Sequence, residues 1–291
     1  MDIMKCQAFI EAVEQGSILG ASQKLDYTPS GINRMINALE DELGITLLIR
    51  NRKGVFLTTD GEILLPLIRQ LVNHNERIFQ TCAELNSLIC GTLKIGSYYS
   101  VASHKLPELL GKFTTLYPGI RIELTEDGEE ELLTMLKENR IDCCFIGDPP
   151  KDEIHFLPLM EDEAVVWLPR HHLFASQPAF PVEALNDEVF IAMNREKSGI
   201  VNRLISKYQI HLNIRYTTHD AYTAYRMVEA GLGISVNNLL TNKQWSGNVV
   251  ILPLIPHIPV SIGLALSGTA QTSPAASRFI HFIKENWSNE L

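Results

Sequence analysis

The stretch that decides the fold is residues 17–43, SILGASQKLDYTPSGINRMINALEDEL. It predicts two short helices joined by a tight turn at Asp26 and Tyr27. In the second helix the apolar side chains recur at spacings of four, three and four, which is typical of the buried stripe of an amphipathic helix. These side chains are Ile32, Ile36, Leu39 and Leu43.

The same helix carries a polar face on another side, formed by Ser30, Asn33, Arg34 and Asn37. Hydroxyl and amide side chains together with an arginine are the types that contact base edges and phosphates. Thr28 is a good N-cap, and Pro29 at the first helical position loses no hydrogen bond. The pattern predicts a helix-turn-helix in which residues 29–41 enter the major groove. The alternative is that this face is only the solvated side of a surface helix.

A hairpin is predicted directly after these helices, with strands over 47–49 and 55–57 and a turn at 51–54. Such a hairpin after a helix-turn-helix is a wing. A local basic cluster is expected at its tip in an otherwise acidic chain: Arg50, Arg52 and Lys53. Cations in this place suit the phosphate backbone and add salt-dependent affinity with little sequence information.

Residues 1–65 resemble the N-terminal domain of LysR-type transcriptional regulators. The resemblance rests on FIEAVEQGSILGASQKL, YTPSGINRMINALEDELGITLL and RKGVFLTTDGEILL, and in order and spacing it extends over the whole chain. Family members often have Gln-Pro-Ala at the start of the recognition helix and a Ser before the Arg. This chain keeps Arg34 but has Pro29, Ser30, Gly31 and Asn33 there. The resemblance therefore implies binding to double-stranded promoter DNA, without a base preference taken from relatives.

The composition fits a globular protein of two or three domains, with 291 residues, 45% hydrophobic and 20% charged. A net charge of −9 argues against indiscriminate nucleic-acid binding, although locally positive surfaces permit specific binding. The sequence has no apolar run of about 18 residues and no signal peptide, so we expect a cytoplasmic protein without a membrane partner.

No spacing among the five cysteines matches a zinc site. They are Cys6, Cys82, Cys90, Cys143 and Cys144. Buried cysteine usually behaves as a small apolar residue, but some members of the family are redox sensors. A cysteine-based, redox-responsive transcriptional regulator is therefore the alternative function.

The sequence has no nucleophile elbow, no P-loop and no His-Glu-x-x-His metal site. His171 and His172 are adjacent, so on a strand they would face opposite sides. We expect no enzyme, no metal site and no cofactor. A transport solute-binding protein would share the predicted two-lobed fold, but it would need an export signal and would not carry residues 1–90.

A long helix is predicted over 59–90, with Thr59 as its cap in a capping box with Glu62 and with Pro66 kinking it near the start. Its heptad spacing indicates pairing between helices, as in the family's antiparallel dimerisation helix. The expected dimer contacts are Leu64, Ile68, Leu71, Asn75, Ile78 and Leu85. Asn75 lies near the midpoint, so an Asn pair would fix the register. The alternative is that Asn75 points to water.

Beyond residue 91 strands and helices alternate in two sets, which predicts parallel sheets. Long strands at 164–168 and 258–266 lie at the ends of the second set, and the last helix, 274–287, returns to the first. The fold class is thus an α/β C-terminal region of two Rossmann-like lobes, of periplasmic-binding-protein type, after an all-α winged helix-turn-helix domain and a linker helix. The expected domains are 1–58 (DNA-binding), 59–90 (linker), 91–162 with 267–291 (lobe I) and 163–266 (lobe II).

Ligands of such sheets bind beyond the carboxyl ends of the strands. The segments found there, rich in hydroxyls and amides, are Ser97, Tyr98, Tyr99 and Ser100; Thr125; Gly147 and Asp148; Met193 and Asn194; and His219 and Asp220. They suit a small polar or carboxylated effector, although each residue alone could be a helix cap or turn former, as Ser100 or Ser103 could be. Asp148 would disfavour an anion unless it pairs with a cation. The family often has a Pro where this chain has Asn237-Asn238, which alters one wall.

The function predicted from all segments is a sequence-specific transcriptional regulator controlled by a small-molecule effector bound between two lobes. Its expected partners are promoter DNA, the effector and further copies of the chain, as a homodimer or a homotetramer that is a dimer of dimers. RNA polymerase is a candidate partner of such a regulator.

Overall fold

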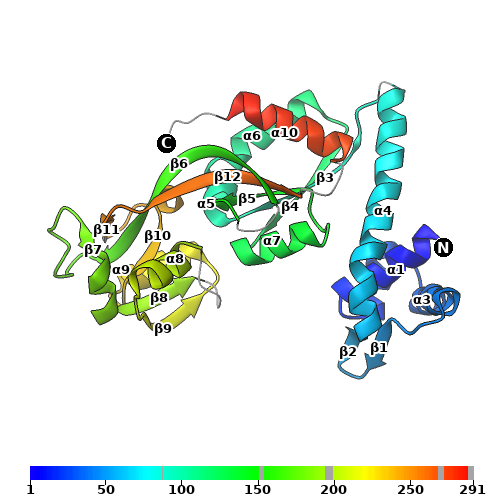
Figure 1. Cartoon of the computed structure of the whole chain (residues 1–291), viewed down its shortest axis with the longest axis horizontal. Coiled ribbons are helices and arrows are strands. Elements are labelled where there is room, and N and C mark those ends of the chain that lie inside the picture. The colour runs from blue at the N-terminus through cyan, green and yellow to red at the C-terminus, as the bar shows by residue number, and fades with distance from the viewer. Residues whose placement is uncertain (87, 151–153, 194–198, 268–271, 288–291) are drawn as a thin grey trace. The chain divides into compact units, whose positions relative to one another are not determined.

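The computed structural model describes residues 1–86, 88–150, 154–193, 199–267 and 272–287 (Figure 1). It divides into two compact units. Unit 1 comprises Met1–Gly91 with Lys137–Arg140 and Ser273–Ala275, and unit 2 comprises the remaining ranges, Thr92–Leu136, Ile141–Thr272 and Ala276–Leu291. None of the helices in these described ranges is long and apolar enough to cross a membrane.

Three helices begin unit 1: α1 (Ile3–Glu14), α2 (Ile18–Leu25) and α3 (Pro29–Leu43). The predicted helix-turn-helix is confirmed, and local signals explain it. The Thr28 side chain accepts a hydrogen bond from the Gly31 amide at the start of α3. Asp26 ends α2 in the left-handed conformation, and Gly44 ends α3 in the same way. The stripe of α3 is buried at Ile32, Ile36 and Leu39, whereas Leu43, in the last turn, is 37% exposed.

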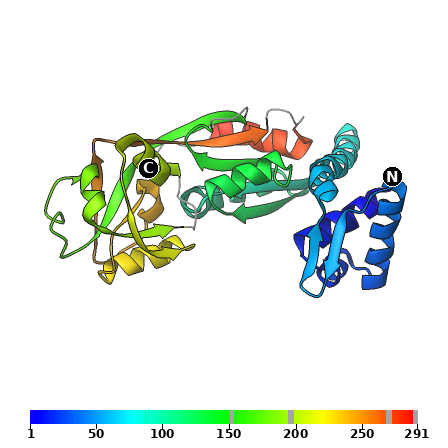
Figure 2. The same ribbon diagram turned by 60° about the horizontal axis from the view of Figure 1, so that its bottom comes forward.

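The predicted wing is also confirmed. Strand β1 (Leu48–Asn51) pairs antiparallel with β2 (Gly54–Leu57), and Asn51 faces Gly54 across the turn. Both views show the hairpin at the end of unit 1 where α4 begins (Figure 2). Leu48 and Val55 join the core formed by the three helices, so the hairpin is part of this domain's hydrophobic packing.

The long helix α4 (Thr59–Leu85) starts differently from the prediction. Thr58, not Thr59, is the N-cap, because Thr58 is extended and its hydroxyl accepts a hydrogen bond from the Gly61 amide. The same hydroxyl donates to the Thr46 carbonyl oxygen at 2.7 Å, which ties the helix start to the preceding loop. The capping box with Glu62 is therefore wrong by one residue.

The predicted seam of α4 is divided between two environments. Ile68 is 4% exposed and packs in the core of the DNA-binding helices, and Leu64 and Leu71 lie partly buried against the same core. By contrast, Ile78 is 61% and Leu85 81% exposed. The first half of the seam thus stabilises unit 1 itself, because α1 packs against it.

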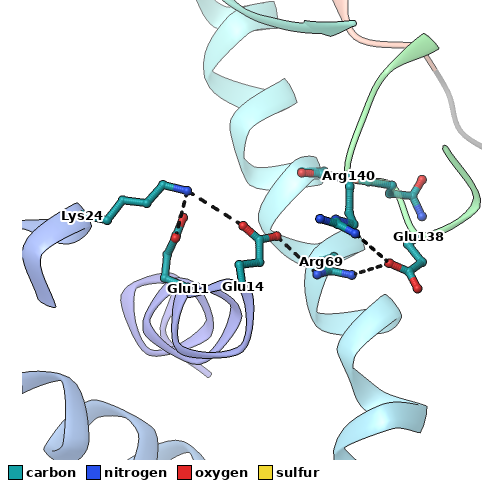
Figure 3. A network of polar contacts seen from close by, with 8 residues as sticks. Glu11, Glu14, Lys24, Arg69, Glu138 and Arg140 are labelled. Carbon is teal, nitrogen blue, oxygen red and sulfur yellow. Dashed lines mark hydrogen bonds and ion pairs between the residues drawn. The ribbon is translucent and has the colours of Figure 1, made fainter. Parts of the chain in front are cut away.

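A buried arginine on α4 organises the polar contacts of unit 1 (Figure 3). The Arg69 side chain is 6% exposed and pairs with Glu14 of α1 at 3.3 Å and with Glu138 at 3.0 Å. Lys24 of α2 in turn contacts Glu11 at 3.0 Å and Glu14 at 3.9 Å. One guanidinium shared by two carboxylates compensates for the removal of its charge from water.

Unit 2 is built on an eight-stranded sheet in the order β4-β3-β5-β12-β6-β11-β7, with β10 paired to β6. The first set of elements comprises β3 (Gly91–Ser97), β4 (Ile120–Glu126), β5 (Cys143–Gly147), α5 (Tyr99–His104), α6 (Leu106–Leu116), α7 (Glu129–Lys137) and α10 (Pro274–Asn286). β3 and β5 are parallel, as predicted. α5 and α6 follow each other directly, interrupted at Lys105, just before Pro107.

The second set comprises β8 (Val189–Met193), β9 (Asn213–Thr218), β10 (Ser235–Asn238), α8 (Gly199–Tyr208) and α9 (Ala221–Glu229). β8 and β9 are parallel. The sequence prediction missed β7 (Phe180–Pro181) and β11 (Val249–Ile255), which extend the large sheet, and two short 3-10 helices, Val182–Asp187 and Leu239–Asn242.

Two long strands run through both sets, and the first begins ten residues before the strand predicted at 164–168. β6 (Ile154–Pro169) and β12 (Pro259–Ser267) pair antiparallel from Pro259 opposite Glu163 to Ser267 opposite Ile154. Figure 1 shows them as the two long arrows that connect the ends of unit 2. They place the carboxyl ends of β3, β5 and β8 in one compact unit, where a ligand can contact both sets.

Candidate DNA-binding surface and effector cavity

The polar face of α3 is accessible at its N-terminal half. Ser30, Arg34 and Asn37 are exposed and Asn33 is half-buried. Thr28 and Pro29 are exposed as well, and the Thr28 hydroxyl lies 3.1 Å from the Ser30 hydroxyl. An exposed guanidinium among short polar side chains at a helix N-terminus is able to contact base edges and phosphates.

Arg50 differs from its predicted place. It lies on β1 and not in the turn, and its guanidinium donates to Asn37 Oδ1 at 2.7 Å and to Glu40 Oε2 at 3.0 Å. Glu40 Oε1 also accepts hydrogen bonds from the amides of Leu47 and Leu48, at 2.7 and 3.0 Å. The Glu40 carboxylate therefore attaches the wing to α3, and it neutralises much of the charge of Arg50.

The other two cations of the wing remain at the turn. Arg52 and Lys53 are both exposed. The Lys53 amide donates to Asn51 Oδ1 at 2.8 Å, which shapes the turn through a local side-chain contact. Two exposed cations on a protruding turn suit contact with the phosphate backbone.

A cavity of about 200 Å³ lies in unit 2 beside the carboxyl ends of the strands. Of the predicted effector residues it is lined by Tyr98, Tyr99, Ser100, Met193 and His219. Asn237 and Asn238, expected at one wall, also line it. The sequence did not indicate these further lining residues: Glu126, Asp127, Gly128, Glu129, Glu130, Glu131, Gly199, Ile200, Ala221, Val236, Thr241 and Val260. Asn194 lies outside the described residues.

The remaining predicted residues are not among the described lining residues: Ser97, Thr125, Gly147, Asp148 and Asp220. Three of them have structural contacts instead. The Ser97 hydroxyl is buried and donates to the Tyr98 carbonyl oxygen. Asp220 caps α9 by accepting from the Thr223 amide at 2.6 Å. Asp148 forms an ion pair with Arg203 at 2.8 Å, which is the cation that its position required.

Ser100 is buried in α5 and does not cap that helix, which has no side-chain cap. Its hydroxyl accepts a hydrogen bond from Asn238 Nδ2 at 3.2 Å, and the same nitrogen donates to Asp162 Oδ2 at 2.7 Å. Thr241 donates to Asn238 Oδ1 at 2.7 Å, and Asp162 Oδ2 also accepts from the Leu240 amide at 3.1 Å. This network joins the first set, the second set and β6, and each of its amide atoms is satisfied.

Asn237, the neighbour of Asn238, is not satisfied. It is 2% exposed, and its Nδ2 donates to the Ser235 hydroxyl at 3.3 Å. Its Oδ1 is buried and has no hydrogen-bond partner among the described residues. The Tyr98 hydroxyl is likewise buried without a partner of normal geometry in the described part of the chain. Both side chains line the cavity, so both are available to a ligand.

The described part of the cavity lining is acidic. Its described lining residues include five carboxylates and no lysine or arginine: Glu126, Asp127, Glu129, Glu130 and Glu131. Glu129 Oε1 accepts a hydrogen bond from the Gly147 amide at 2.7 Å. Burial raises the pKa of Glu129 to about 7, although the Gly147 amide lowers it, and nearby Asp148 raises it further. This charge disfavours a carboxylated effector. From sequence alone, acids before and in the first turn of α7 resemble ordinary helix-start residues.

The cysteines of unit 2 are poorly suited to redox sensing. Cys143 and Cys144 lie on β5 and are both fully buried. Burial raises the pKa of Cys143 well above its usual range and that of Cys144 to about 12. Their thiols are therefore protonated and unreactive at neutral pH.

Comparison with known proteins agrees with this architecture. Residues 3–62 match the model of the bacterial regulatory helix-turn-helix protein, lysR family, and residues 86–288 match the LysR substrate binding domain. The uncharacterized HTH-type transcriptional regulator YvbU of Bacillus subtilis (strain 168) is 28% identical over 100% of both chains. TtuA, an HTH-type transcriptional regulator of Agrobacterium vitis, is 27% identical, with 88% of this chain and 86% of TtuA covered.

Solved structures show the same fold. A full-length OxyR variant from Pseudomonas aeruginosa has a TM-score of 0.70 at 19% identity, over 99% of each chain. CbnR, a LysR family transcriptional regulator, complexed with its target DNA has a TM-score of 0.66 at 20% identity, over 98% of this chain and 99% of CbnR.

A winged helix-turn-helix followed by a long helix and a two-set α/β unit with a cavity defines a ligand-responsive class of DNA-binding transcriptional regulators, not a class of enzymes. The chain belongs to the LysR family of bacterial transcriptional regulators, with its helix-turn-helix in residues 3–62 and its effector-binding domain in residues 86–288.

Proposed function

We propose that this regulator binds promoter DNA through α3 and the wing and that a small polar molecule in the unit 2 cavity controls its activity. One observation supports control by a ligand: residues of both sets of elements line the cavity. Tyr98 and Glu129 come from the first set, and Met193, Gly199 and Asn237 from the second. A ligand that contacts both sets favours the arrangement that brings them together, and regulation requires such a difference in affinity between two arrangements.

In the proposed DNA complex Arg34 contacts a base edge or an adjacent phosphate, and Ser30 and Asn33 supply further polar contacts. Arg52 and Lys53 contact phosphates of the flanking groove. Arg50 and Asn37 act mainly on each other, so that they position α3 relative to the wing. This divides the predicted DNA-binding residues into contacting and positioning residues.

The proposed assembly is a homodimer, or a dimer of dimers, formed through the exposed part of α4. This half of the helix has an apolar surface, because Ile78 is 61%, Phe79 68% and Leu85 81% exposed. Asn75 lies at the border between the buried and exposed halves and remains the proposed register residue. The proposed domain limits are 1–58, 59–90, 91–162 with 267–291, and 163–266.

The experiment that tests ligand control starts with DNA sites selected by the full-length protein from a random library. Compounds that raise the melting temperature are then added to the protein–DNA complex, and affinity and footprint are measured. The proposal expects a stabilising compound to change the affinity or the footprint. A compound that stabilises the protein through the cavity and leaves the DNA complex unchanged would contradict it.

A further inference from the structure

We propose that the effector is a small organic cation, carrying an amine or guanidinium group, and not a carboxylate. This inference rests on the proposed function, because it assigns a chemical class to the ligand of the same cavity. Three features of the described lining support it: the sign of the charge, a buried acceptor without a partner, and a largely buried carboxyl group at the cavity wall.

Among the described lining residues the charge is one-sided. Glu126, Asp127 and Glu130 are exposed and Glu131 is half-buried, so most of these carboxylates are in contact with water. Burial raises the pKa of Glu126, and the nearby carboxylates of Asp220 and Asp127 raise it further. Asp220 is the neighbour of the lining residue Ala221. Like charges around one cavity attract a cation and repel an anion.

The orientation of the Asn237 amide follows from its hydrogen bonds. The Ser235 hydroxyl donates its proton to the Ile191 carbonyl oxygen at 2.9 Å, so it can only accept from Asn237. The amide nitrogen of Asn237 must therefore face Ser235, and Oδ1 is left as an acceptor. Because Asn237 is 2% exposed and Oδ1 has no partner in the described chain, a ligand donor there removes the cost of an unsatisfied buried group.

Glu129 provides the second acceptor. Its Oε1 accepts from the Gly147 amide at 2.7 Å, and burial of the carboxyl group raises its pKa. Glycine at 147 and at 199 leaves room for this carboxyl group, since a Cβ at either position would collide with its oxygens. The groups that face it are Asp148, Arg203 and Glu130, and Asp148 and Arg203 already pair with each other.

An ammonium or guanidinium group matches these features, because it is positive and carries only donors. A carboxylate ligand would present acceptors to Asn237 Oδ1 and to the glutamates. The tyrosines Tyr98 and Tyr99 also line the cavity, and aromatic faces attract organic cations. The cavity therefore offers charge, a hydrogen-bond acceptor and tyrosine rings to one kind of ligand.

The test uses probes matched in size that differ in charge. Melting temperature and calorimetric affinity of the full-length protein are measured at pH 8 with putrescine, 1,4-butanediol and succinate, and with tyramine, tyrosol and 4-hydroxyphenylacetate. The proposal expects at least one amine to bind about tenfold or more tightly than its neutral and acidic counterparts, since a charge-assisted hydrogen bond is worth about 1.5–3 kcal/mol.

Variants locate the binding. Asn237→Ala and Glu129→Gln are each expected to weaken binding of that amine by about tenfold or more, and Glu183→Gln, an exposed glutamate of unit 2 outside the cavity, is the matched control. Two variants are used so that a loss of folding in one of them leaves the other informative. Equal binding by all three variants would overturn the assignment.

The outcomes separate this inference from the proposed function. If the acids stabilise the protein and the amines do not, the ligand is an anion, so the inference is wrong and the effector cavity stands. If neither amines, acids nor neutral probes bind, both the inference and the proposed cavity fail.

Discussion

The DNA-binding helices and the effector cavity differ in how two of their buried groups are paired. In unit 1 the charges of Arg50 and Arg69 are compensated by carboxylates, since Arg50 pairs with Glu40, and Arg69 with Glu14 and Glu138. Around the cavity of unit 2, Asn237 Oδ1 is buried without a hydrogen-bond partner in the described chain, and the Tyr98 hydroxyl is buried without a partner of normal geometry there. Compensated groups hold a domain together, whereas uncompensated ones cost stability until a ligand satisfies them.

Within unit 2, the neighbours Asn237 and Asn238 on β10 differ in the same way, one with its hydrogen bonds satisfied and one without. Asn238 is saturated by Ser100, Asp162 and Thr241, and it links elements from both sets. Asn237 is not saturated and faces the cavity. Adjacent residues of the same type thus have a structural role and a ligand-binding role, and the following substitutions distinguish the two.

The largest effect is expected from Asp162→Ala. The carboxylate of Asp162 is 6% exposed and accepts from Asn238, from the Leu240 amide and from the Glu163 amide, so its removal leaves buried donors without acceptors. We expect a loss of about 3–4 kcal/mol in the free energy of unfolding. Urea denaturation checks this, with exposed Glu161→Ala as the control. A loss as small as that of the control would mean that the network does not stabilise unit 2.

Arg34→Ala is expected to weaken binding to selected DNA sites by about 1–3 kcal/mol. Arg34 is exposed, so the melting temperature should not change. Fluorescence anisotropy measures the affinity, and Arg121→Ala, an exposed arginine in unit 2, is the matched control. Unchanged operator affinity would show that α3 does not contact DNA through this face.

Glu129→Gln is expected to stabilise the protein at high pH. The pKa of the Glu129 carboxyl is about 7 in the folded chain, and its ordinary value is 4.5, so folding favours the protonated form. Above pH 7 the group is charged in the folded chain and lowers its stability. Below pH 4.5 it is protonated in both states, and this cost disappears. Gln lacks this cost. We expect a gain of about 1–2 kcal/mol at pH 8 after allowance for solvent.

Chemical denaturation at pH 8 and pH 5 measures this gain, which should shrink toward pH 4.5. A gain of the same size at both pH values would assign the effect to packing and not to charge. For the wild type, amine affinity should rise as pH passes through about 7, because Glu129 then carries its negative charge more often. Glu129→Gln should lack this rise.

The smallest effect per residue is expected from Arg52→Ala combined with Lys53→Ala. Loss of two phosphate contacts should weaken selected and random DNA alike, by about 1 kcal/mol at moderate salt, and should reduce the salt slope by about 2. Titrations of both DNAs at several salt concentrations measure this. Weaker binding to selected DNA alone would mean that the wing reads sequence.

The helix-turn-helix and the wing could be predicted from the sequence, because short stretches of neighbouring residues determine them. Thr28 and Pro29 define the start of α3 because the cap bond to Gly31 spans three residues. The wing follows from one turn between two apolar runs. Even here the cap of α4 was wrong by one residue, because Thr58 and Thr59 are chemically equal and the contacts of Thr58 with Thr46 and Leu47 distinguish them.

The cavity could be predicted only in part, because its contacts join segments far apart in the sequence. Strand ends located Tyr98, Tyr99, Ser100, Met193 and His219. The resemblance placed Asn237 and Asn238 at one wall, but the contact of Asn238 with Asp162 depends on the pairing of β10 with β6, which no local pattern reveals. Strand β11 contains Pro253, which is unusual within a sheet and hides its apolar pattern.

The most direct test of ligand control through the cavity is the DNA affinity of wild type and Asn237→Ala, measured by anisotropy with and without the stabilising amine. Without the amine the two proteins should bind DNA equally, because Asn237 lies in unit 2. With it, the wild-type affinity or footprint should change several-fold, and that of the variant should not. An equal response in both proteins, or a bound amine that leaves the wild-type complex unchanged, would contradict control through this cavity.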